Sequence, residues 1–170
     1  EMITQHLAYS GAVGTGEYIV SDVHDLNLPL KVEAKFQLDP LSNFPGEGAI
    51  TIPMGLADSE IYKMAKNKLD EKLVFPQFCQ SRNTEDSVEL SFPEHTQITK
   101  IPEAIDFEDG LIQYHSSYVL EGNTVKVHRK LISNRKTNVC IPSEMMEAWN
   151  NFLKVLKWDV RGQVFYRTEI

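Results

Sequence analysis

The run of residues from Ser87 to Ile141 constrains the fold of this chain more than any other stretch. In it, segments rich in β-branched and aromatic residues alternate apolar with polar side chains, a period of two that predicts strands with one buried face. A turn triplet, Glu121 to Asn123, separates two of these segments and predicts a long hairpin. The two arms are expected to bury one face each, formed by Ile112, Tyr114, Ser116, Tyr118 and Leu120 and by Val125, Val127, Arg129 and Leu131.

The N-terminal third predicts further strands, over residues 3–9, 17–22, 30–38 and 48–52. The clearest is LKVEAKFQL, in which apolar and polar side chains alternate without a break. The glycines of GAVGTG, which are Gly11, Gly14 and Gly16, are expected in a turn between two strands. Their spacing is not G-x-G-x-x-G and a strand follows them, so they do not indicate a nucleotide-binding loop.

Two helices interrupt this β pattern. Pro142 and Ser143 predict the start of an amphipathic helix over about 143–158, with Ser143 as its cap. Its apolar stripe comprises Met145, Trp149, Phe152, Leu153 and Leu156. A short helix is expected over 57–69, capped by Asp58 or Ser59, and the residues after Gly162 are expected to form a final edge strand. The chain is therefore predicted to be mainly β, an antiparallel β-sandwich with one C-terminal helix, in a single domain over residues 1–170.

Composition excludes several classes of protein. The 170 residues are 42% apolar, which suffices for a buried core, and the net charge of −7 disfavours a nucleic-acid partner. The basic residues gather only at Lys126, His128, Arg129, Lys130, Arg135 and Lys136, a group typical of a solvated strand face and its turn. No run reaches the ~20 apolar residues that a membrane-spanning helix needs, so no membrane span is expected.

The two cysteines, Cys79 and Cys140, leave two alternatives open. One disulfide across a loop of about 60 residues would stabilise the fold by roughly 4 kcal/mol. Two separate buried thiols, packed as small apolar side chains, are the other interpretation. The first residues do not resemble a signal peptide, and a start at Glu1 favours a fragment or a mature chain over a complete precursor.

Motifs for catalysis or metal binding are weak. Cys140 with His128 or His115 is the nearest approach to a thiol hydrolase, but a structural cysteine at a strand end is the favoured interpretation. The five histidines lie far apart, and the local group of His24 with Asp22 and Asp25 is more typical of a polar loop. Neither a metal nor a cofactor is expected.

Tyrosines are the remaining indication of ligand binding. Tyr9, Tyr18, Tyr114 and Tyr118 are candidate binding residues, since an exposed tyrosine ring can stack on a sugar or fill a protein interface. Packing within strands is the alternative explanation and is favoured.

One family resemblance involves specific residues. The pairs Phe92-Pro93 and Ile101-Pro102, the run Tyr114 to Leu120, the run Gly122 to Leu131 and a helix started by a proline follow one another in this order. The segment from Val88 to Lys154 thereby resembles the C-terminal β-sandwich region of bacterial transglutaminase-like multidomain proteins.

The resemblance implies an accessory domain of a larger, exported protein whose catalytic residues lie in a separate papain-like core. The expected function is therefore non-catalytic interaction with a neighbouring domain or another protein. A carbohydrate-binding module that uses exposed tyrosines is the alternative, followed by a thiol hydrolase. By resemblance, the expected location is extracytoplasmic, in the periplasm or at the cell surface.

Overall fold

The computed structural model of the chain describes residues 13–39, 46–52, 59–66, 75–135 and 139–168. The chain divides into two compact units, Glu1–Phe44 and Pro45–Ile170, and each is described by itself below. The predicted strand over 3–9 and the candidate Tyr9 lie outside the described residues.

In residues 13–39, the first unit forms an antiparallel hairpin of β1 (Gly14–Val20) and β2 (Val32–Leu38). Gly14 and Gly16 lie within β1, so the expectation that they form a turn is wrong. Gly16 lies opposite Phe36, and a Cβ atom placed on it would be 2.3 Å from the Lys35 carbonyl oxygen. The glycine is thus required by close strand approach and not by a turn.

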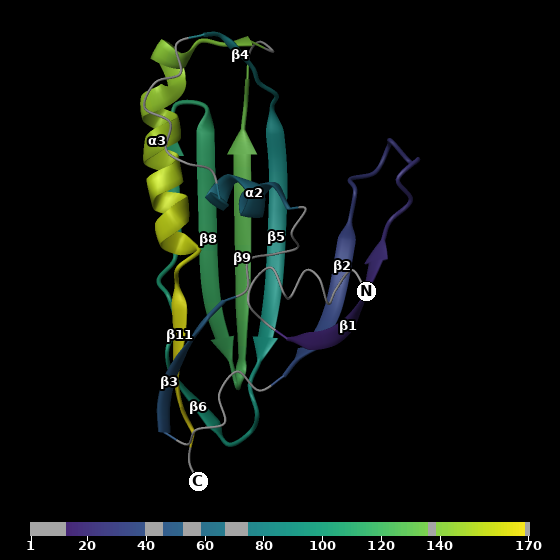
Figure 1. Cartoon of the computed structure of the whole chain (residues 1–170), viewed down its shortest axis with the longest axis vertical. Coiled ribbons are helices and arrows are strands. Elements are labelled where there is room, and N and C mark those ends of the chain that lie inside the picture. Colours follow the sequence, from purple (N-terminus) through teal and green to yellow (C-terminus); the bar gives the residue numbers. More distant parts are fainter. Residues whose placement is uncertain (1–12, 40–45, 53–58, 67–74, 136–138, 169–170) are drawn as a thin grey trace. The chain divides into compact units, whose positions relative to one another are not determined.

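The second unit is built on a four-stranded antiparallel sheet with the order β5-β9-β8-β7, of which Figure 1 labels β5, β9 and β8. Its strands are β5 (Arg82–Ser91), β7 (Ile105–Asp109), β8 (Ile112–Glu121) and β9 (Thr124–Ser133). The predicted long hairpin is confirmed as β8 and β9, and Gly122 at its turn has a φ of 58°, which glycine adopts without strain.

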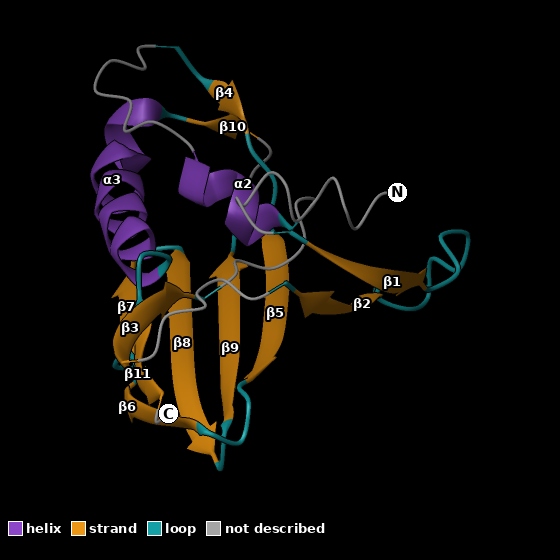
Figure 2. Cartoon of the chain, turned by 60° about the horizontal axis from the view of Figure 1, so that its bottom comes forward, coloured by secondary structure: helices purple, strands orange, loops and turns teal. Residues whose placement is uncertain are grey.

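A mixed layer covers one face of this sheet (Figure 2). It consists of the helices α2 (Glu60–Lys66) and α3 (Pro142–Asp159) and a three-stranded sheet of β3 (Gly46–Thr51), β6 (Thr96–Lys100) and β11 (Gln163–Thr168). The prediction of a mainly β, antiparallel sandwich with a C-terminal helix is confirmed. In the order β3-β11-β6, the last strand is central, so the predicted edge position is wrong.

The sequence correctly predicts the N-terminal cap of α2 but not that of α3. Ser59 precedes α2 and its Oγ accepts a hydrogen bond from the Tyr62 amide at 3.3 Å, as one of the two predicted caps. In α3 the cap position is Ile141 and not Ser143, and Pro142 occupies the first turn. Proline suits that position because its fixed φ is helical and its missing N–H would have no partner within the helix.

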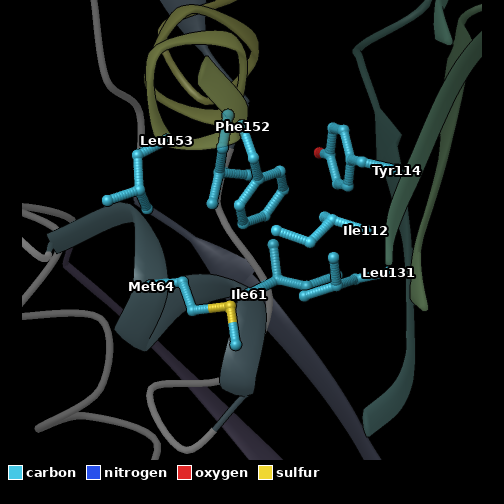
Figure 3. Close-up of a cluster of buried hydrophobic side chains, with 8 residues drawn as sticks. Ile61, Met64, Ile112, Tyr114, Leu131, Phe152 and Leu153 are labelled. Carbon is cyan, nitrogen blue, oxygen red and sulfur yellow. The ribbon is translucent and has the colours of Figure 1, made fainter. Parts of the chain in front are cut away.

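The core forms two apolar clusters along the inner face of the main sheet. The first joins both helices to the sheet and comprises Ile61, Met64, Ile112, Tyr114, Leu131, Phe152, Leu153 and Leu156 (Figure 3). The second joins the three-stranded sheet to the other end of β8 and β9 and comprises Ile52, Tyr118, Val125, Val127 and Val164.

A buried polar group lies where the two clusters meet. Arg129 on β9 is paired across the strands with Ser116 on β8, and both side chains are buried. Asp159, the last residue of α3, is 3% exposed, and its Oδ2 accepts a hydrogen bond from Arg129 Nε at 2.9 Å. The same carboxylate accepts hydrogen bonds from Ser116, Tyr114 and Tyr118, at 2.7, 2.7 and 2.8 Å. The end of the helix is thereby tied to both central strands.

We expect the Asp159→Asn substitution to lower the free energy of unfolding by roughly 3–5 kcal/mol, because it removes the carboxylate that is hydrogen-bonded to the buried Arg129 charge. Urea denaturation measures the change. Trp158→Ser, one residue earlier on the exposed side of α3, should change stability by less than about 0.5 kcal/mol. Equal losses in the two variants would contradict this account.

Candidate functional site

The tyrosines proposed for ligand binding divide between the two units. Tyr114 and Tyr118 are buried and their hydroxyls donate to Asp159, which agrees with the favoured explanation of packing within strands and excludes the alternative of exposed binding rings. Tyr18 on β1 is 39% exposed. Of the described candidates, only Tyr18 presents its ring to solvent.

Burial and the neighbouring Asp159 carboxylate keep both buried tyrosines protonated. Burial raises the pKa of Tyr118 to about 12, a shift that Asp159 reinforces and Arg129 opposes. Burial also raises the pKa of Tyr114, and the Asp159 carboxylate adds to the shift. Both hydroxyls therefore serve as hydrogen-bond donors within the core and not as proton-transfer groups at neutral pH.

Cys140 has no free thiol. It forms a disulfide with Cys79, with the two Cα atoms 5.8 Å apart, and this decides between the two alternatives left open by the sequence. The bond links the short strands β4 (Gln77–Phe78) and β10 (Val139–Cys140). A thiol hydrolase based on Cys140 and His128 would require the thiolate form, and the His128 imidazole is hydrogen-bonded to Glu85 at 2.8 Å.

Removing the disulfide should destabilise the chain. We expect Cys79→Ser with Cys140→Ser to lower the free energy of unfolding by about 4 kcal/mol, because the bond closes a 61-residue loop in the unfolded chain. Denaturation of the wild type with and without dithiothreitol should reproduce that loss, whereas the double variant should not respond to the reductant. A reductant effect that persists in the double variant would refute the assignment.

The outer face of the four-stranded sheet is polar and carries paired charges. His115 Nδ1 lies 2.6 Å from Asp106, and Glu85 lies 2.8 Å from His128 and 3.9 Å from Lys130. The hydrogen bond with His128 holds the pKa of Glu85 below its usual range. An open hollow over β7, β8 and β9 is lined by Asp106, Glu108, Gln113, His115, Lys130 and Ile132, among others.

These charges agree with the interpretation of a solvated strand face, with one exception. Lys126 and Lys130 point outward and each lies near a glutamate. Arg129, between them in sequence, points inward to Asp159. The basic cluster seen in the sequence is therefore divided between the two faces of the sheet.

The β1–β2 hairpin presents apolar side chains to solvent. One face carries Tyr18 paired with Ala34 and Val20 paired with Val32, and Tyr18, Val20 and Val32 are exposed. The opposite face carries pairs such as Glu17 with Lys35. Exposed apolar side chains that lie together mark interaction surfaces, so this face is a candidate for interaction.

The loop that joins the two strands is also apolar, a feature that reasoning from the sequence missed. Val23, Leu26, Leu28 and Leu30 are exposed by 60, 92, 67 and 65%. The alternating pattern instead predicts Leu30 in a half-buried strand and residues 22–25 as a polar group. A signal for the loop is nevertheless present, since four large aliphatic residues within eight positions are unusual for a solvated turn.

The polar residues of the loop fix its conformation. Asp22 accepts a hydrogen bond from the His24 amide at 2.9 Å, and Asp25 accepts one from the Asn27 amide at 3.0 Å. These are turns in which an aspartate side chain replaces a backbone acceptor. The described residues contain no group of three or more metal-ligating side chains, so the aspartates and His24 do not form a metal site there.

Within the described part of the chain, none of the helices has the length and apolar character needed to span a bilayer.

The comparisons with known proteins give information about the fold and none about the site. No protein-family model matches the chain, and no curated protein matches it. A solved structure, that of a "putative protease" from Parabacteroides distasonis ATCC 8503, is similar in fold, with a TM-score of 0.56 and 15% sequence identity. The match covers 71% of this chain and 23% of that protein, so the shared fold is one part of a much longer polypeptide there.

Proposed function

We propose that this chain is a non-catalytic β-sandwich module that binds a neighbouring domain of the same polypeptide or another protein. The observation that carries the proposal is the concentration of exposed apolar side chains on the hairpin and its loop, over residues 13–32. Exposed apolar groups that lie together mark interaction sites more often than scattered ones do.

Two further observations support the proposal. The fold match lies within a chain more than four times as long as the matched part. Among the described residues of the second unit, Cys140 forms a disulfide with Cys79 and the buried Asp159 carboxylate is ion-paired with Arg129, so neither side chain is free for catalysis. The sequence resemblance implies which kind of domain the neighbour is: a transglutaminase-like core that carries its own catalytic residues.

An extracytoplasmic location belongs to the same proposal. The Cys79–Cys140 disulfide is suited to an oxidising compartment, such as the periplasm or the cell surface. A carbohydrate-binding module is less well supported, because the rings of Tyr114 and Tyr118 are not accessible to a sugar.

The test uses the polypeptide encoded by the full reading frame. The 170-residue chain is titrated into the remainder of that polypeptide, and calorimetry records the dissociation constant, which we expect to be roughly micromolar, as for an interface between domains. Hydrogen exchange should slow at residues 13–38 on binding. An unrelated acidic β-sandwich serves as the control.

Two results would contradict the proposal. One is the absence of both heat and altered exchange at concentrations well above micromolar. The other is a reading frame without any further domain, combined with no binding to other proteins of the same cell compartment.

A further inference from the structure

The apolar loop of the first unit has the properties of an anchor. We propose that the loop from Ser21 to Lys31 inserts Leu26, Leu28 and their apolar neighbours into an apolar pocket, bordered by basic side chains, on a partner protein domain. This inference rests on the proposed function and specifies which residues dock and what they dock against.

The first argument is the degree of exposure. Leu26 is 92% exposed and Leu28 67%, whereas Leu131 and Leu153 in the core are fully buried. Large aliphatic side chains at the centre of an interface contribute most when they enter a closely fitting pocket. A loop at the tip of a hairpin is a projecting shape that fits a concave partner.

The second argument is preorganisation. The base of the loop is closed by two hydrogen bonds, from the Ser21 amide to the Lys31 carbonyl and from the Lys31 amide to Ser21 Oγ, both 2.9 Å long. Within the loop, the carboxylates of Asp22 and Asp25 hold the turns. An already ordered loop loses less conformational entropy on binding than a flexible one.

The third argument identifies the partner by charge. Asp22 and Asp25 flank the apolar side chains, and Lys31, the only lysine or arginine from Ser21 to Lys31, is paired with Glu33. The loop therefore carries net negative charge, which an anionic lipid surface would repel. A protein pocket with lysine or arginine at its rim complements both the apolar and the acidic groups.

The experiment titrates variants of the full 170-residue chain into the remainder of its parent polypeptide. We expect Leu26→Ser with Leu28→Ser to weaken binding by at least about tenfold, because both side chains are central in the proposed contact. Circular dichroism should remain unchanged, since neither residue contributes to the core. Trp158→Ser, an exposed apolar residue of the second unit, is the matched control and should bind within about twofold of the wild type.

A second pair of substitutions tests the charge argument. Asp22→Asn with Asp25→Asn retains side-chain oxygens that can accept the turn hydrogen bonds but removes both charges. Binding should weaken, and its dependence on salt concentration should become smaller. An unchanged salt dependence would overturn the assignment of a basic rim.

The remaining outcomes distinguish failure of the anchor from failure of the proposed function. If the wild type binds and the double leucine variant binds equally well, the anchor is refuted while the proposed function stands. If the wild type binds neither the remainder of the polypeptide nor any other protein of the same cell compartment, the proposed function itself fails. Sedimentation with vesicles of phosphatidylcholine, with and without phosphatidylserine, should show no binding, and leucine-dependent binding to either kind of vesicle would replace the protein partner with a membrane.

Discussion

The second unit depends on the hydrogen bonds that the carboxylate of Asp159 accepts. Asp159 lies at the end of α3, where the helical part of the covering layer ends and, after a short turn, β11 of the three-stranded sheet begins. Its four hydrogen-bonding partners lie on β8 and β9, so one side chain holds both parts of the covering layer against the same two strands. A buried ion pair of this kind adds little net stability compared with apolar packing, but removal of one partner is costly. We therefore interpret it as a determinant of how the layers are aligned.

Most of the fold follows from the sequence because its elements have strong periodic patterns. The hairpin of β8 and β9 and the helix α3 are predicted to within about two residues, since alternation and helical spacing directly reflect burial. The prediction that Ser143 caps α3 is wrong. Serine is a preferred cap by residue type, but Pro142 fixes where the helix begins, one residue earlier. The central position of β11 is not predictable, because strand order depends on contacts between residues far apart in sequence.

The site is predicted less well, for a physical reason. Arg129 is correctly placed on the apolar face of its strand, and an arginine in that position requires a buried acid, but the sequence does not show which acid meets it in space. The same limit applies to the tyrosines, because alternation places Tyr114 and Tyr118 on the inner face while their side-chain type suggests ligand binding. In the loop after β1, residue type is the better guide, since its leucines violate the expectation for a solvated turn.

The central claim is that Asp159 joins the two apolar clusters into one cooperative unit, while the β1–β2 hairpin is a separate and less stable element. Native-state hydrogen exchange of the isolated chain in low concentrations of denaturant tests this claim most directly. We predict that amides near Val125 and Leu131, at the two ends of β9, exchange with the same free energy as global unfolding, and that amides of β1 and β2 exchange at much lower free energy. Separate opening of the two ends of β9, or equal protection of the hairpin, would contradict the account.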